Sequence, residues 1–125
     1  LTYLEDKTSK LTIDEITQPK FENKFQKSKQ DVFNVGVSAS TFWIKVTVQN
    51  ISPQIRDWLL YSSYTFLDEI IFYKKDSQNK WTSESIGLKY KFANRPIKHR
   101  YLVFPLNFKD TTSQTFYLKI TSETP

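Results

Sequence analysis

The sequence has no cysteine, a single histidine and only two glycines among its 125 residues. Without cysteine there is no disulfide framework, no thiolate metal site and no cysteine nucleophile. A zinc site needs several His or Cys ligands, so we expect no metal. Gly36 and Gly87 stand far apart, which excludes a glycine-rich loop that cradles phosphate.

The chain also lacks catalytic and targeting signals. It has no nucleophile elbow, and the adjacent Asp68 and Glu69 would point to opposite faces of a strand, where they cannot serve one glycosidic bond. We therefore expect no enzyme and no cofactor. No run approaches the roughly 18 apolar residues of a transmembrane helix, and no signal peptide is visible. The start at Leu1, without Met, reads as a domain excised from a longer protein.

Aromatic residues are abundant, with 10 Phe, 7 Tyr and 3 Trp, and they stand among Val, Ile and Thr. Such residues favour strands. A capping box, Thr12 with Glu15 three residues on, predicts one helical turn over 12–17 that ends before Pro19. Residues 18–31, with Phe21 and Phe25, fit a short helix or a loop pinned by those rings. Strands are expected over 1–5, 41–50, 57–63, 67–75, 80–86, 101–107 and 115–122.

Short strands at about ten-residue spacing predict an all-β sandwich or barrel in one domain. The net charge of +5 fits nucleic acid, an anionic membrane surface or an acidic ligand. The lysines are scattered, however, which is typical of a solvated surface. We therefore expect no nucleic-acid partner; binding that weakens steeply with salt would contradict this.

Two of the expected strands share one pattern: residues 42–47 (FWIKVT) and 116–121 (FYLKIT). Because strand side chains alternate between faces, the first, third and fifth residues of each are expected in the core. The opposite face then carries a large aromatic followed two residues later by a cation. An aromatic ring can stack on a sugar while lysine donates hydrogen bonds. The predicted ligand-binding residues on this face are Trp43, Lys45, Tyr117 and Lys119.

An alternative for the same face stays open. The N-terminal segment would cover Trp43, with Phe21, Phe25 or Tyr3 as its lid, and Lys45 would lie along its own stem.

A second cluster of cations lies in residues 92–101, in a predicted loop and strand start. Arg95, His99 and Arg100 are predicted to close one side of the ligand site, with arginine supplying a planar donor fork. The alternative is that Arg95 and His99 only tie down the loop through backbone carbonyls and nearby carboxylates.

The order of several short motifs resembles extracellular domain 2 of the bacterial 7TMR-DISM receptors, which are seven-transmembrane receptors with diverse intracellular signalling modules. The motifs are residues 3–6 (YLED), 11–16 (LTIDEI), 33–36 (FNVG), 42–50 (FWIKVTVQN), 58–60 (WLL), 67–73 (LDEIIFY), 95–100 (RPIKHR) and 116–120 (FYLKI). Lys45 and Lys119 stand where the family tends to have Arg, so the charge is kept and the bidentate fork is lost.

The resemblance implies a periplasmic jelly roll, similar to galactose-binding-like carbohydrate modules, built of two antiparallel sheets. Residues 1–125 would form one sensor domain, followed by transmembrane helices and a cytoplasmic output domain. Our leading hypothesis is that it binds a carbohydrate or a related small polar molecule on one sheet face. The alternative is an interaction module that transmits signals through a homodimer or a partner protein, without a small-molecule ligand.

Overall fold

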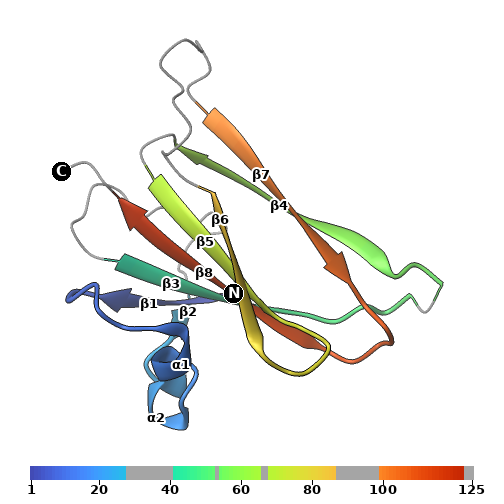
Figure 1. Ribbon diagram of the computed structural model, residues 1–125, viewed down its shortest axis with the longest axis horizontal. Coiled ribbons are helices and arrows are strands. Elements are labelled where there is room, and N and C mark those ends of the chain that lie inside the picture. The colour runs from blue at the N-terminus through green and yellow to red at the C-terminus, as the bar shows by residue number, and fades with distance from the viewer. Residues whose placement is uncertain (28–40, 53, 66–67, 87–98, 123–125) are drawn as a thin grey trace.

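A computed structural model of the chain describes residues 1–27, 41–52, 54–65, 68–86 and 99–122. They form two sheets in which every pairing is antiparallel (Figure 1). The larger has the strand order β2-β1-β3-β8-β5-β6 and the smaller pairs β4 with β7. The predicted all-β sandwich is confirmed, whereas the jelly-roll topology stays a prediction. The strands are β1 Thr2–Asp6, β2 Gln26–Lys27, β3 Thr41–Val48, β4 Asp57–Thr65, β5 Asp68–Lys75, β6 Trp81–Ile86, β7 His99–Asn107 and β8 Gln114–Ser122.

The two strands with the shared pattern, β3 and β8, are neighbours at the centre of the larger sheet. Their register places Ile44 opposite Leu118, so aliphatic residues face each other on one side. On the other side Trp43 is opposite Lys119, and Lys45 is opposite Tyr117. Each aromatic ring is therefore paired with an ammonium group across the strands, where such neighbours interact directly.

The inner face of the larger sheet carries the main core, as the period-two pattern predicts. Phe72 and Phe116 stack there with ring centroids 5.6 Å apart. Leu106 at the end of β7 and Phe108 just after it join this core from the smaller sheet. Each large side chain buried in this way contributes about 1.5–3 kcal/mol. The buried members are Ile44, Ile70, Phe72, Leu106, Phe108, Phe116, Leu118 and Ile120.

Two short helices, α1 Ile13–Ile16 and α2 Pro19–Glu22, lie across the outer face of the larger sheet. The capping box is confirmed: Thr12 Oγ1 accepts from the Glu15 N–H at 3.3 Å, and Glu15 Oε1 accepts from the Thr12 N–H at 3.1 Å. Pro19 ends the first helical segment and starts the second, because its fixed φ suits the first helical position. In the described part of residues 18–31, a four-residue helix with Phe21 buried is observed, and it ends before Phe25; residues 28–31 lie outside the described residues.

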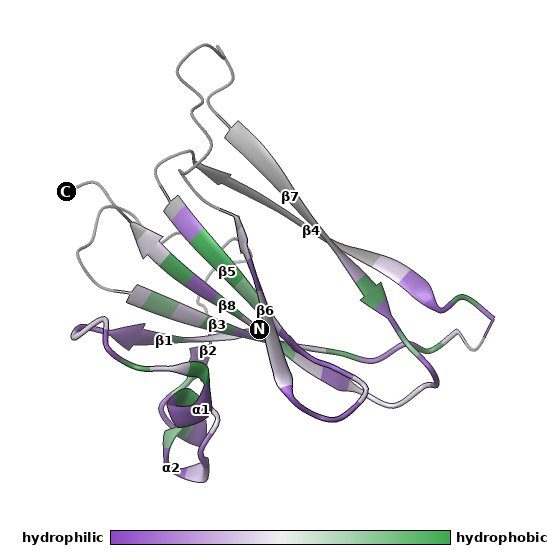
Figure 2. Cartoon of the chain, viewed as in Figure 1, coloured by the Kyte–Doolittle hydropathy of each residue, from purple (hydrophilic) through white to green (hydrophobic). Residues whose placement is uncertain are grey.

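The domain therefore has three layers, with the helices on one side of the six-stranded sheet and β4–β7 on the other (Figure 1). Along β8, the apolar residues Phe116, Leu118 and Ile120 alternate with more polar ones, as expected of a strand that separates two different environments (Figure 2). No helix in the described part of the chain has the length and apolar character needed to cross a membrane.

Candidate functional site

Trp43 is fully buried, with 0% of its side chain exposed. It lies in an outer cluster with residues of the helical segment and of β1 and β8: Leu4, Ile16, Phe21 and Tyr117. The prediction that Trp43 stands on an open sheet face is thus wrong, and the alternative of a lid from the N-terminal segment is observed. The physical reason is the large apolar area of the indole, which gains more from the apolar helix faces than from water.

Burial leaves the indole of Trp43 with an unusual environment. Its Nε1–H finds no hydrogen-bond acceptor among the described residues. The ring lies 5.5 Å from that of Tyr73, and Lys119 Nζ stands 5.4 Å from its centroid. An unpaired buried donor costs about 1–3 kcal/mol. Lys119 thus lies against the Trp43 ring at the edge of the outer cluster, and Trp43 presents no surface to a ligand.

The other two predicted strand residues, Lys45 and Tyr117, reach a cavity of about 950 Å³ at one end of the larger sheet. The cavity lies between the β5–β6 hairpin and the turn that joins β7 to β8, and we call it the hairpin groove. It is lined by Thr17, Lys45, Lys74, Lys75, Asp76, Ser77, Asn79, Trp81, Thr82, Leu106, Asn107, Lys109, Asp110, Thr112, Ser113, Gln114, Thr115, Phe116 and Tyr117.

Two aromatic rings mark the outer side of the hairpin groove. Trp81, which is half-buried, meets Tyr117 edge to face with centroids 5.3 Å apart. Lys75 is paired with Trp81 across the hairpin and holds its Nζ 5.1 Å from the indole centroid. Burial, and then the charge of Glu22, raise the pKa of the Tyr117 hydroxyl, which stays protonated and able to donate a hydrogen bond.

Sequence reasoning did not identify Trp81 and Lys75. Trp81 begins the strand after a hairpin turn. Such a turn places the strand that follows it beside the strand that precedes it. The hairpin turn could be recognised in the sequence. The residue that pairs with Trp81, however, depends on the register of the hairpin, and only the structure shows that it is Lys75.

Both aspartates of the hairpin groove are used by their own turns. Asp76 Oδ1 accepts from the N–H groups of Gln78 and Lys80, at 2.8 and 2.9 Å. Asp110 Oδ1 accepts from the Thr112 N–H at 2.8 Å. Hydrogen bonds from Thr112, together with nearby positive charges, lower the pKa of Asp110. The carboxylates therefore fix the shape of the rim.

The described part of the second predicted cluster, the backbone of His99 and Arg100, lies at the other end of β7 from this groove. Arg95 lies outside the described residues. His99 and Arg100 begin β7, opposite Thr65 and Tyr64, whereas Asn107 of the groove ends the same strand. Eight residue steps separate His99 from Asn107, which is roughly 26 Å along a strand. A role for these residues in binding stays a prediction.

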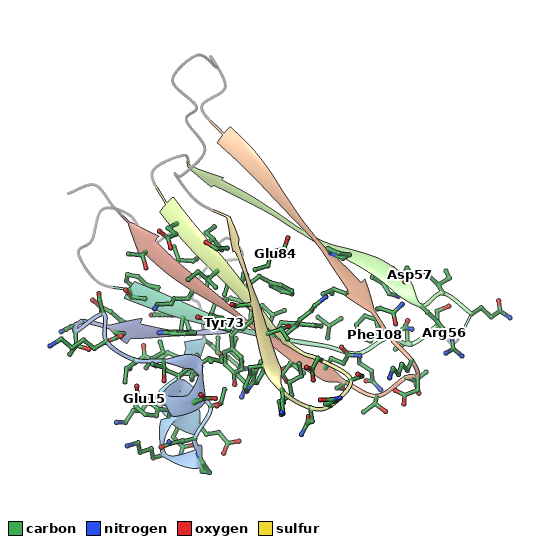
Figure 3. All side chains as sticks on the ribbon, in the orientation of Figure 1. Glu15, Arg56, Asp57, Tyr73, Glu84 and Phe108 are labelled. Carbon is green, nitrogen blue, oxygen red and sulfur yellow. The ribbon has the colours of Figure 1, made fainter. Side chains whose placement is uncertain are left out.

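A separate surface feature lies in the connection from β3 to β4 and the start of β4. Ile51, Ile55 and Trp58 are exposed by 85%, 51% and 43%, and we call them the apolar turn. Asn50 fixes it by accepting from Trp58 Nε1–H at 3.1 Å and donating to the Ile55 carbonyl at 2.8 Å. Figure 3 shows the neighbouring Arg56 and Asp57 close to Phe108, at the end of the molecule where β4 begins.

Across the described ranges, no group of three or more His, Asp or Glu residues is placed to hold a metal ion. The fold defines an all-β sandwich domain with a helical cover on one sheet. The chain belongs to the 7TMR-DISM extracellular 2 family, which matches residues 1–125. It is therefore an extracytoplasmic domain of a membrane-receptor family, in keeping with a sensor role. No curated protein matches the chain.

Proposed function

We propose that this domain senses a carbohydrate or a related small polar molecule, which binds in the hairpin groove. The observation that carries the proposal is the pairing of Trp81 and Tyr117 beside a groove edged by lysines. The site thus keeps two of the residues inferred from the sequence, Lys45 and Tyr117, and moves the aromatic platform from Trp43 to Trp81.

The chemistry of the groove suits such a ligand. Its volume of about 950 Å³ falls in the range of small-molecule sites, roughly 300–1,000 Å³. An indole face can stack on the apolar side of a sugar ring, while hydroxyl, amide and ammonium groups bind its hydroxyls. The polar side chains available for this include Thr82, Asn107, Ser113 and Gln114.

In the full receptor, residues 1–125 would act as one sensor domain that passes its state to transmembrane helices and a cytoplasmic output domain. A ligand shifts such an equilibrium only if it binds one arrangement more tightly than the other. The hairpin groove is suited to this because it is formed by two turns and the end of α1, so a change in their spacing alters the ligand's contacts.

Thermal-shift screening of the chain against sugars and organic acids tests the proposal. We expect a saccharide to raise the melting temperature and Trp81→Ala to abolish the rise. Trp58→Ala is the matched control, because it removes a partly exposed indole outside the groove lining. A saccharide response that persists in Trp81→Ala would place the site elsewhere.

A second candidate function, an interaction or homodimerisation module, is favoured by the apolar turn. Exposed Ile and Trp side chains of this kind mark contact sites on many soluble domains. We expect Ile51→Ser with Ile55→Ser to abolish any self-association seen by sedimentation velocity. A single monomeric species across the accessible concentration range would contradict homodimerisation through this turn.

A further inference from the structure

We infer that the ligand of the hairpin groove is a carboxylated saccharide rather than a neutral one. This inference rests on the proposed function and names the class of ligand for the same site. It follows from the balance of charge in the groove, from the absence of ion pairs there and from the position of the cations beside the aromatic rings.

The groove lining is cationic. Four lysines line it, Lys45, Lys74, Lys75 and Lys109, against two aspartates, which leaves two positive charges. Both aspartates accept hydrogen bonds from the backbone of their own turns. They are therefore committed to the rim, and a neutral ligand would leave the ammonium groups without an anionic partner.

Three of the lysines are free to bind an anion. Lys45, Lys74 and Lys75 form no ion pair among the described residues, whereas Lys109 places its charge near Asp110. Lys75 contacts the Trp81 ring at 5.1 Å and Lys45 lies 6.0 Å from the Phe25 ring. A cation–π contact at an exposed site is worth only about 0.5–1 kcal/mol. A hydrogen bond to a charged group is worth about 1.5–3 kcal/mol, so a carboxylate competes well for these ammonium groups.

The register of the sheet sets Lys45 and Lys75 on the two strands that flank Tyr117, with Trp81 on the next strand beyond Lys75. Lys45 on β3 is opposite Tyr117 on β8, which is in turn opposite Tyr73 on β5. Lys75 follows Tyr73 by two residues on the same face, and it is opposite Trp81. Strands lie 4.7–4.9 Å apart, so β3 and β5 are about 10 Å from each other. A sugar ring over the indole can thus direct a carboxylate toward Lys75, and one that extends over Tyr117 can reach Lys45.

Isothermal titration of the chain with three probes tests the inference: α-1,4-linked digalacturonate, neutral galactobiose with the same linkage, and succinate. We expect digalacturonate to bind about tenfold more tightly than galactobiose, the effect of one charge-assisted hydrogen bond. Added salt should weaken the binding of digalacturonate alone. Succinate, which has carboxylates and no sugar ring, should bind weakly.

Lys45→Gln with Lys75→Gln should bring the affinities for digalacturonate and galactobiose to within about threefold of each other. Lys10→Gln with Lys27→Gln is the control, since it removes the same charge at exposed positions outside the groove. Equal binding of the two disaccharides to the unmodified chain overturns the inference and leaves the proposed function standing.

A preference for digalacturonate that survives in the Lys45 and Lys75 variant places the charge recognition elsewhere and also overturns the inference. Succinate binding as tightly as digalacturonate would make the ligand an organic acid. If none of the three probes or other saccharides binds, both the proposed function and the inference are wrong.

Discussion

At the scale of single residues, Trp43 connects the sheet to its helical cover. Its ring is enclosed by Leu4, Ile16 and Phe21, and its Nε1–H has no acceptor among the described residues. The packing of the ring must therefore outweigh the cost of the unpaired donor. This is possible because a buried aromatic side chain removes 150–250 Å² from water, worth about 4–6 kcal/mol at 25 cal/mol per Å².

Trp43→Ala should therefore lower the free energy of unfolding by about 3–5 kcal/mol, the usual cost of deleting a buried Trp. Urea denaturation followed by far-UV circular dichroism measures the loss. Trp58→Ala, at an indole that is 43% exposed, should cost about 1 kcal/mol, mainly the hydrogen bond to Asn50. Similar losses in the two variants would mean that Trp43 is not enclosed as described.

Asp6 is a second residue with a measurable role, at the end of β1. Its carboxylate accepts from the Thr8 hydroxyl at 2.6 Å, the Thr8 N–H at 3.0 Å and the Leu11 N–H at 3.0 Å. Burial acts to raise its pKa, but these hydrogen bonds together outweigh burial and lower the pKa below the usual 3.8. The ionised form is thus favoured in the folded state.

Because the folded pKa is the lower one, the stabilisation is complete above pH 3.8 and is lost as the pH falls through the folded value. Asp6→Asn should cost about 2 kcal/mol at pH 7, the value of hydrogen bonds to a charged acceptor. The difference from the unmodified chain should shrink below pH 3.8. Urea titrations between pH 7 and pH 2 measure it, and a difference that stays constant with pH contradicts the assignment.

At the scale of elements, the β5–β6 hairpin shapes one wall of the groove. Its turn closes with an Asn79 N–H to Asp76 carbonyl bond of 3.0 Å, and Asn79 has φ of 64°. This left-handed conformation is one that Asn tolerates and that a residue with an ordinary Cβ resists by about 1–2 kcal/mol. Asn79 therefore supports the turn through its backbone conformation, in addition to the hydrogen bonds that the Asp76 carboxylate accepts.

Asn79→Ala should destabilise the domain by about 1 kcal/mol, whereas Asn79→Gly should leave its stability nearly unchanged. Thermal unfolding of the two variants, compared with the unmodified chain, measures both effects. The order of the two variants is the decisive point: if Gly costs as much as Ala, the Asn79 side chain rather than its backbone conformation supports the turn.

The sequence predicted elements better than it predicted what covers them. Alternation in β3 and β8 is local, so the inner and outer residues of both strands followed from spacing alone. Whether Trp43 meets water or a helix depends on α1 and α2, which lie much earlier in the chain, within residues 13–22. Local patterns left that question with two alternatives. The strand β2 has only two residues, too few to show an alternating pattern. The place of Trp81 in the groove could not be predicted, because it depends on the register of the β5–β6 hairpin.

At the scale of the whole molecule, β3 and β8 belong to two cores at once. Ile44 packs in the inner cluster and Trp43, its neighbour, in the outer one. Likewise, Phe116 packs in the inner cluster and its neighbour Tyr117 in the outer one. Because successive strand residues cannot move independently, loss of the outer cluster should weaken the inner one. We therefore expect the helical segment to unfold together with the sandwich.

Ile16→Ala tests this coupling, since Ile16 is 99% buried at the end of α1 (1% exposed) and such a change costs about 2–5 kcal/mol. Tryptophan fluorescence reports mainly on the outer face, through Trp43 and Trp81, and far-UV circular dichroism reports on both sheets. The two urea midpoints should fall together in the variant, as in a two-state transition. If fluorescence changes at lower urea than circular dichroism, the helices are a separate lid that can open over Trp43. The outer face would then be available to a ligand after all.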